Sequence, residues 1–272
     1  MPRSRRLMLT WLMLLVGTAG CNQADPAPVA VARDQPVVVF AAASLREVFT
    51  ALAVVFEQSH PRAEVVLHFA GSQELRTQVE HGATVDVFAS ADARHLQELE
   101  RGGYVRDALT FAGNEPVVVV ASERAGTLRA FAELPSATRI AVGSREVPIG
   151  RYTEQILDRA STSLGAEFGA RVRANIVSRE LNVRQVLARV TLGEVEAGIV
   201  YRTDALAAKT PIVTVSIPPH VNVLAAYTIA VAVAAPRPQL ARQWIELLVS
   251  PAGQRALDRA GFLPADKASS VR

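Results

Sequence analysis

Cysteine is almost absent from this sequence, whose 272 residues include only Cys21. An internal disulfide is therefore excluded, whatever the redox state of the compartment in which the chain folds. The chain is long enough to bury a substantial core, and 50% of its residues are hydrophobic. Packing and backbone hydrogen bonding must therefore hold the fold together.

Motifs for catalysis and metal binding are also missing. The sequence contains no H-E-x-x-H, no G-x-S-x-G, no phosphate-binding P-loop and no G-x-G-x-x-G. No pair of carboxylates is placed for acid–base catalysis. The five histidines show no metal-ligand spacing: His60, His68, His81, His95 and His220. We therefore expect no enzyme activity, no cofactor and no metal held directly by side chains.

The first twenty residues have the layout of a secretory signal peptide. Arg3, Arg5 and Arg6 precede an apolar run from Leu7 to Val16, and small residues follow it. The run is too short to span a bilayer. Removing this segment takes the formal net charge from +3 to zero, so the basic balance is no sign of nucleic-acid binding. We predict that residues 1–20 are a signal peptide and that the protein is exported to the periplasm or cell envelope.

Residues 21–36 are predicted to form a flexible tether, because NQADPAPVAVARDQP is rich in Ala, Pro and polar residues and has no periodicity. Cys21 directly follows the small residues TAG. This arrangement resembles a bacterial lipoprotein signal, although Thr18 replaces the usual leucine, and it implies a lipid anchor at Cys21. A plain signal peptide with an incidental cysteine is the alternative. The segment SRRLML also resembles a twin-arginine signal, which leaves the export route open.

From Val37 onward, apolar runs alternate with helical patterns. In PVVVFAAASLREVFTALAVVF, the five apolar residues Val37 to Ala41 predict a strand buried on both faces, and a helical spacing follows. Ser44 and Glu47 have the form of a capping box, so we expect Ser44 to cap this helix. The alternation recurs along the chain, which predicts βαβ units and an α/β fold with mostly parallel sheets.

Two long β-prone stretches interrupt this rhythm, ALTFAGNEPVVVVASE and HVNVLAAYTIAVAVAA. We expect them to cross between two lobes and to return the C-terminal helices to the first lobe. The expected domains are lobe 1 at residues 37–114, lobe 2 at 115–225, and a return to lobe 1 at 226–272. Ligands collect in such a cleft, outside the carboxyl ends of the strands.

Several motifs together resemble the molybdate-binding proteins of bacterial ABC transporters. They are AAASL, FAGSQELRTQVEHGATVDVFASAD, VPIGRY, NVRQVLARV and GEVEAGIVYRTDA, in this order from about Val37 to near the C-terminus. The resemblance implies the type II periplasmic binding protein fold, with two lobes and two crossover segments. It also implies that uncharged donors hold a tetrahedral oxyanion, molybdate or tungstate, between the lobes.

Carried over by motif, the resemblance assigns five binding residues. Ser44 and Ser72 would bind from lobe 1 through their hydroxyl and backbone N–H groups. Ile149 and Val183 would donate backbone N–H groups from lobe 2, and Tyr201 would donate its phenol. Alanine is common in the family at the position of Ile149, and the change keeps the backbone donor while altering the pocket wall.

The residues themselves support an anion site, because four of the five lie where a loop enters a predicted helix. Such starts present unpaired N–H groups and partial positive charge, and several around one cavity bind an anion without lysine or arginine. Each residue alone has a simpler role in a cap, a turn or the core, so the prediction depends on their joint occurrence. Asp86 is interpreted as structural and Asp92 as a helix cap, since a carboxylate near a dianion would repel it.

The expected function is capture of molybdate or tungstate and its delivery to an ABC permease and ATPase, by a monomer that touches the membrane through its lipid anchor. A binding site for another anion, such as sulfate or an organic acid, is the alternative. Arg46 and Arg184 fall in the first turns of helices at the cleft and could clamp a carboxylate. A ferric site would favour more phenolates and carboxylates than Tyr201 offers. An envelope enzyme and a purely structural lipoprotein are further alternatives.

Overall fold

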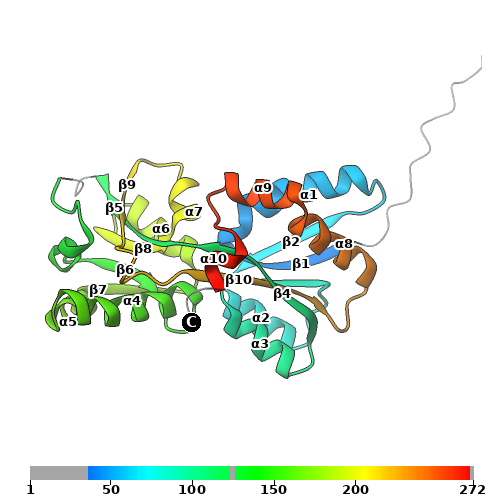
Figure 1. Ribbon diagram of the computed structural model, residues 1–272, viewed down its shortest axis with the longest axis horizontal. Coiled ribbons are helices and arrows are strands. Elements are labelled where there is room, and N and C mark those ends of the chain that lie inside the picture. The colour runs from blue at the N-terminus through cyan, green and yellow to red at the C-terminus, as the bar shows by residue number, and fades with distance from the viewer. Residues whose placement is uncertain (1–35, 123–125, 270–272) are drawn as a thin grey trace, which may run out of the picture. The chain divides into compact units, whose positions relative to one another are not determined.

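The computed structural model describes residues 36–122 and 126–269, whose strands form two five-stranded sheets (Figure 1). The predicted signal peptide at 1–20, Cys21 and the tether as far as residue 35 lie outside the described residues. In the described ranges, no helix combines the length and the hydropathy needed to cross a membrane.

The first sheet has the strand order β2-β1-β3-β10-β4. Strands β1 to β3 are parallel, whereas β10 pairs antiparallel with both β3 and β4. Its strands are β1 (Val37–Ala42), β2 (Val65–Ala70), β3 (Val87–Ser90), β4 (Val105–Asn114) and β10 (Ala225–Ala232). The helical segments of this lobe are η1 (Ala43–Leu45), α1 (Arg46–Ser59), α2 (Ser72–Glu80), α3 (Ala93–Arg101), α8 (Pro238–Val249), α9 (Pro251–Arg259) and α10 (Ala265–Ser269).

The second sheet has the order β7-β6-β8-β5-β9, in which β5 is antiparallel to β8 and β9. Its strands are β5 (Pro116–Ala121), β6 (Ile140–Gly143), β7 (Ile176–Glu180), β8 (Ala197–Tyr201) and β9 (Ile212–Ser216). The helical segments are η3 (Phe131–Ser136), α4 (Pro148–Leu164), α5 (Glu167–Ala174), α6 (Val183–Thr191) and α7 (Arg202–Leu206). The predicted two-lobed α/β fold is confirmed. Each sheet is mixed, because β5 and β10, from the two long β-prone stretches, pair antiparallel with their neighbours.

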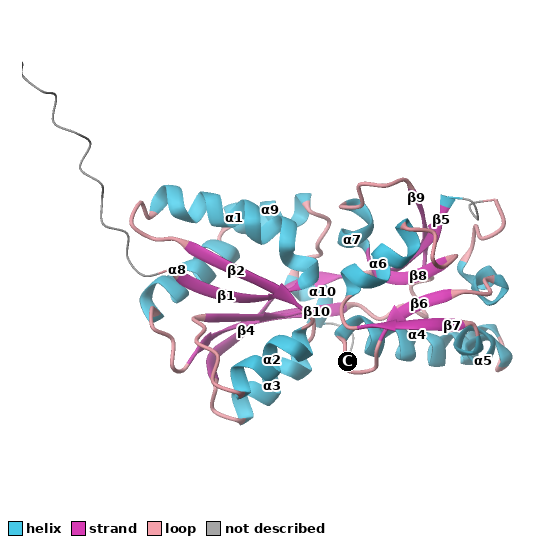
Figure 2. Cartoon of the chain, turned by 180° about the vertical axis from the view of Figure 1, so that it is seen from behind, coloured by secondary structure: helices cyan, strands magenta, loops and turns pink. Residues whose placement is uncertain are grey.

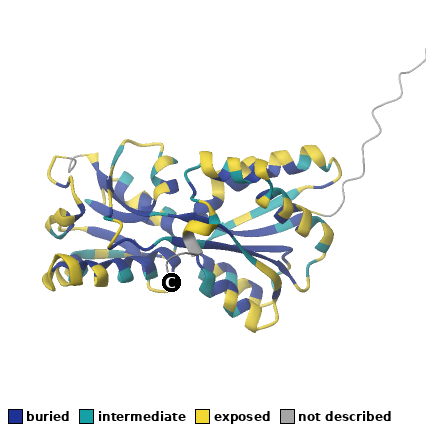
Figure 3. Cartoon of the chain, in the orientation of Figure 1, coloured by how far each residue is buried: buried dark blue, intermediate teal, exposed yellow. Residues whose placement is uncertain are grey.

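Hydrophobic runs in the sequence become the buried strands of both sheets. The four valines of β5, Val117 to Val120, are all buried, as expected for a strand covered on both faces. Figure 3 shows the central strands buried, whereas the edge strands β2, β7 and β9 are largely half-buried and many exposed residues lie on the outer faces of the helices. Gly82 and Gly193 follow the ends of α2 and α6 with φ of 86° and 70°, a conformation that favours glycine and stops a helix.

The prediction that Ser44 caps the first long helix is wrong. A 3-10 turn, η1, precedes α1, so that helix begins at Arg46 with Leu45 as its N-cap residue and no side-chain cap. The Ser44 hydroxyl instead lies 2.6 Å from the hydroxyl of Tyr227 on β10. Glu47, the other half of the expected capping box, forms an ion pair with Arg184. The Ser44 side chain is consequently available for a role outside the helix.

The structural interpretation of Asp86 and Asp92 is confirmed. Asp92 is the N-cap residue of α3 and accepts a hydrogen bond from the His95 backbone N–H at 3.2 Å. Asp86 accepts backbone N–H groups from Val38 at 2.8 Å and Arg237 at 2.6 Å, which ties β1 to the segment before α8. Both carboxylates therefore satisfy backbone donors in lobe 1.

Candidate functional site

One small cavity between the two sheets brings together all five predicted binding residues. Its free volume, about 10 Å³ for the centre of a water-sized sphere, is close to that of a single water molecule, so a drug-sized ligand is excluded. No charged side chain is among the described residues that line it. Lobe 1 contributes Ala42, Ala43, Ser44, Ala70, Gly71, Ser72 and Ala91, and lobe 2 contributes Val147, Pro148, Ile149, Asn182, Val183 and Tyr201.

The lobe 1 wall is built from segments that follow the parallel strands. Residues of η1 follow β1, and Gly71 and Ser72 connect β2 to α2; Figure 2 shows β2 directed toward the other sheet. The Ser72 hydroxyl accepts the backbone N–H of Ala91 at 3.1 Å, just after β3. Since an alcohol that accepts one hydrogen bond still has its own hydrogen to donate, Ser72 can serve as a donor to the cavity.

The lobe 2 wall consists of two helix starts whose first N–H groups are left free. In α4 the N-cap residue Val147 has no capping side chain and Pro148 has no N–H, so Ile149 carries the first backbone donor. In α6 the Asn182 side chain accepts from the N–H groups of the second and third residues and leaves the Val183 N–H uncapped. Within residues 36–122 and 126–269, neither Ile149 N–H nor Val183 N–H has an acceptor. Both positions offer an anion a donor and a helix dipole.

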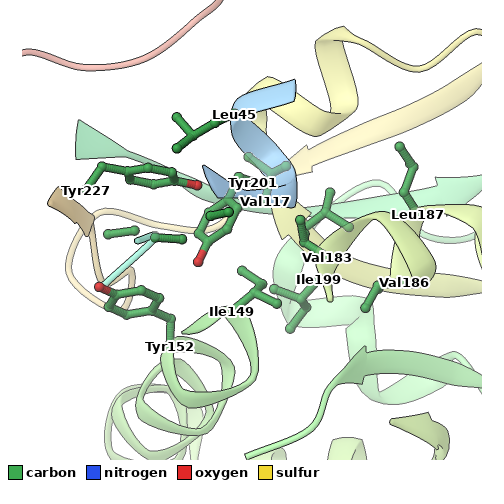
Figure 4. Packing of buried hydrophobic residues seen from close by; sticks show 14 of the residues in the cluster. Leu45, Val117, Ile149, Tyr152, Val183, Val186, Leu187, Ile199, Tyr201 and Tyr227 are labelled. Carbon is green, nitrogen blue, oxygen red and sulfur yellow. The ribbon is translucent and has the colours of Figure 1, made fainter. Parts of the chain in front are cut away.

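Tyr201, at the end of β8, presents a buried phenol without a hydrogen-bond partner in the described part of the chain. The residue is 1% exposed, and burial raises the pKa of its hydroxyl well above the usual value, so the group stays protonated. Figure 4 shows the Tyr201 hydroxyl directed toward the side of Ile149 and away from Tyr227. An unpaired buried hydroxyl is costly, so this phenol is free to donate to an acceptor that enters the cavity.

Side chains next to residues of the cavity join the two lobes, and no local pattern in the sequence predicted these contacts. Arg151, two residues after Ile149, forms an ion pair with the lobe 1 cap Asp92 at 3.0 Å. Arg184, directly after Val183, pairs with Glu47 of lobe 1. The ion pairs form only when the lobes lie together, so they stabilise the closed arrangement beside each helix start.

Two further hydrogen bonds join the lobes at the same place. The His95 side chain uses its Nε2 atom to contact the Glu146 carbonyl oxygen at 2.9 Å, and the Gln73 side chain donates to the Leu181 carbonyl at 2.7 Å. Burial lowers the pKa of His95 despite its proximity to Asp92. Because a carbonyl oxygen can only accept, the His95 Nε2 atom carries the hydrogen of this bond.

Arg184 also pairs with Asp204, a buried residue of α7, with 2.7 Å between Nε and Oδ1. Burial raises the pKa of Asp204 from 3.8 to about 7, although Arg184 opposes the shift. A carboxyl whose pKa is raised in the folded state binds its proton more tightly there than in the unfolded chain. Its contribution to the free energy of unfolding is thus full below pH about 4 and is lost as the pH rises to about 7.

We accordingly expect the stability of Asp204→Asn, relative to the unsubstituted protein, to rise between pH 4 and pH 7 and then to level off. The total change should be on the order of a few kcal/mol. Urea unfolding of the ligand-free protein across this range measures it. Asp258→Asn, an exposed substitution of the same kind, is the control. A stability difference that stays constant with pH would show that Asp204 titrates as an ordinary carboxylate.

Comparison with known proteins agrees with this architecture. The chain matches the family described as bacterial extracellular solute-binding protein over residues 37–263. The molybdate-binding protein ModA of Mycobacterium tuberculosis is 38% identical over 257 residues, which cover 92% of this chain and 94% of the relative.

Solved structures show the same fold. The periplasmic molybdate-binding protein of Azotobacter vinelandii is 20% identical with a TM-score of 0.72, over 84% of this chain and 98% of that one. The sulfate-binding protein SubI of M. tuberculosis is 17% identical with a TM-score of 0.75, over 86% of this chain and 88% of that one. The two lobes thus have the arrangement of periplasmic binding proteins.

Proposed function

Because the chain belongs to the bacterial extracellular solute-binding protein family, we propose that it captures molybdate or tungstate between its lobes and delivers it to an ABC permease. The ligand is held by Ser44, Ser72, Ile149, Val183 and Tyr201. The protein catalyses no reaction in this role and needs no cofactor.

The main observation that supports this proposal is a set of unpaired hydrogen-bond donors around a cavity that no charged side chain lines. The N–H groups of Ile149 and Val183 and the hydroxyl of Tyr201 have no acceptor within the described ranges, and Ser44 and Ser72 lie opposite them. A tetrahedral dianion supplies acceptors on every side. Helix starts and backbone amides are known to bind such anions without a counter-charge.

An organic acid fits the same cavity less well, because the arginines that could clamp a carboxylate are occupied elsewhere. The Arg46 guanidinium lies over the ring of Phe69, 4.6 Å from its centre. Arg184 pairs with Glu47 and Asp204, and neither arginine lines the cavity. Sulfate differs from molybdate mainly in size and remains the stronger competitor.

The location of the protein follows from the same proposal. A signal peptide at residues 1–20 directs export, and a lipid on Cys21 anchors the tether at 21–36 to the outer face of a membrane. The lobes comprise residues 37–114 with 226–272, and 115–225, a division that follows the strands of the two sheets except that Ala225 is the first residue of β10. The protein acts as a monomer. Mass spectrometry of the N-terminal peptide from the membrane fraction tests the anchor.

Calorimetric titration of the protein truncated at Cys21 tests the function. We expect tight binding of molybdate and of tungstate, each with one ion per chain. A flat titration with both ions would remove the functional proposal.

The loss of molybdate affinity caused by each substitution in the cavity should depend on the hydrogen-bond donor that it removes. Ser72→Ala and Tyr201→Phe each delete a hydrogen bond to a charged ligand, at a cost of about 1.5 to 3 kcal/mol, or roughly tenfold to a hundredfold in molybdate affinity. Ser44→Ala should cost a similar amount. Ile149→Ala keeps its backbone donor and should change affinity little. If Ile149→Ala abolished binding while Ser72→Ala left it intact, the assigned roles would be wrong.

A further inference from the structure

A short chain of hydrogen bonds behind the cavity leads to Ser44. Its far end is Asn114, the last residue of β4, which is fully buried. The Asn114 Oδ1 atom accepts the backbone N–H of Glu115 at 2.9 Å. Because a backbone N–H can only donate, this bond fixes the orientation of the amide, and its NH₂ group donates to the hydroxyls of Thr203 at 2.9 Å and Tyr227 at 3.3 Å.

Tyr227 is the middle residue of this series of hydrogen bonds. Its hydroxyl oxygen receives the Asn114 hydrogen and lies 2.6 Å from the Ser44 hydroxyl. Among the described residues that contact the Tyr227 hydroxyl, the Asn114 NH₂ group can only donate, so Ser44 is the acceptor for the Tyr227 hydrogen, which suits a phenol that is more acidic than an alcohol. Burial raises the pKa of Tyr227 well above its usual value, so the hydroxyl keeps this hydrogen.

We propose that Asn114 and Tyr227 are positioning residues that fix the Ser44 hydroxyl as a hydrogen-bond donor toward the cavity. Ser44 accepts from Tyr227, and its own hydrogen is left for the ligand. Ser72 is fixed in the same way by the Ala91 N–H at 3.1 Å. This inference rests on the proposed function of the cavity and explains why its hydroxyls act as donors.

The consequence is selectivity against anions that carry a proton. A hydroxyl free to rotate can accept a ligand proton, whereas one that already receives a hydrogen bond from behind favours donation. Hydrogen phosphate and sulfate are similar in size and differ in that proton, so their affinity ratio reports the donor role of Ser44. Sulfate should be favoured while Tyr227 holds Ser44 in place.

Tyr227→Phe tests the proposal, because it removes the hydroxyl and keeps the ring. The ring packs against Phe262 and Tyr201, with centroid distances of 5.3 and 5.7 Å, so the fold should persist. The ligand-free melting temperature checks this. Tyr104→Phe, on a residue 40% exposed, is the matched control. The affinities for molybdate, sulfate and phosphate are measured by calorimetric competition at one pH. The proteins compared are the unsubstituted protein truncated at Cys21 and, in the same truncated form, Tyr227→Phe, Tyr104→Phe, Ser44→Ala and the double variant that combines Tyr227→Phe with Ser44→Ala.

We expect Tyr227→Phe to lower molybdate affinity by about tenfold and to raise the phosphate-to-sulfate affinity ratio by at least about threefold. Tyr104→Phe should change neither quantity. In the Ser44→Ala background, Tyr227→Phe should have almost no further effect, since no hydroxyl remains to be positioned. Additive losses in the double variant, or an unchanged anion ratio in Tyr227→Phe, would overturn the inference. Failure of the unsubstituted protein to bind molybdate or tungstate would instead overturn the proposed function.

Discussion

Gly71→Ala should lower molybdate affinity by at least about a hundredfold while leaving the ligand-free protein folded. Gly71 lines the cavity, and a methyl group on its Cα would lie 2.4 Å from the Leu181 carbonyl oxygen of lobe 2. A non-bonded carbon and oxygen cannot approach that closely, and the backbone of the opposite lobe can retreat only if the lobes separate. The backbone of Gly71 has φ of −64° and ψ of 141°, which alanine adopts freely. Within lobe 1 the methyl group would also lie 2.4 Å from the Gln73 side-chain amide, but the end of that flexible side chain can move aside.

The size of the effect follows from what separation of the lobes removes. In the proposed site Ile149 and Val183 donate from helix starts in lobe 2, and both would move away from a ligand held by lobe 1. Two lost hydrogen bonds to a charged ligand cost about 3 to 6 kcal/mol together. A ligand stabilises the closed form only by its difference in affinity for the two forms, so that difference would largely vanish.

Calorimetry and small-angle scattering together test this prediction. The unsubstituted protein should have a smaller radius of gyration with molybdate than without it, whereas Gly71→Ala should keep the larger value at saturating ligand. Gly126→Ala is a matched control, because a methyl group there would meet no atom within 4 Å. Normal affinity and normal compaction in Gly71→Ala would mean that the Leu181 contact is not part of the bound state.

The position of the cavity walls at helix starts was predictable from the sequence, because helix starts depend on local rules. A strand that ends in small residues and leads into a helix places free N–H groups at the sheet edge, wherever the strand lies in the fold. The order of apolar and helical patterns was thus enough to locate Ser72, Ile149 and Val183 near helix starts. Capping by Asp92 followed from the same kind of local pattern.

Side-chain partners that are distant in the sequence were not predictable in this way. Ser44 and Glu47 fit a capping box, yet their partners are Tyr227 and Arg184, more than a hundred residues away. A local motif states which bonds a side chain could make, and the tertiary structure decides which one forms. The ion pair between Arg151 and Asp92 was missed for the same reason, since only the packing of the two lobes brings them together.

The largest expected effect concerns the choice between molybdate and sulfate, which the fold alone does not decide, since SubI shares it. Both are tetrahedral dianions, so charge and hydrogen-bond type cannot separate them, and size must. The donors Ile149 N–H and Val183 N–H belong to the starts of α4 and α6, and a buried phenol, Tyr201, lies beside them. The sulfur–oxygen bonds of sulfate are shorter than the molybdenum–oxygen bonds of molybdate, and these rigid donors cannot move inward to reach the sulfate oxygens. The hydrogen bonds to sulfate would therefore be stretched, and stretched hydrogen bonds weaken quickly.

We therefore expect sulfate to bind several powers of ten more weakly than molybdate, because each donor left unsatisfied in a closed site costs about 1 to 3 kcal/mol and two or three would be misplaced. Tungstate, which matches molybdate in charge, shape and nearly in size, should bind almost equally. Competition titrations of the three anions at one pH measure both ratios. In Tyr201→Phe the ratio of molybdate affinity to sulfate affinity should decrease, because the lost phenol is a donor that reaches the larger molybdate ion but not sulfate. Displacement of molybdate by sulfate at comparable concentration would make the cavity a general dianion site, and molybdate would have to be withdrawn as the ligand.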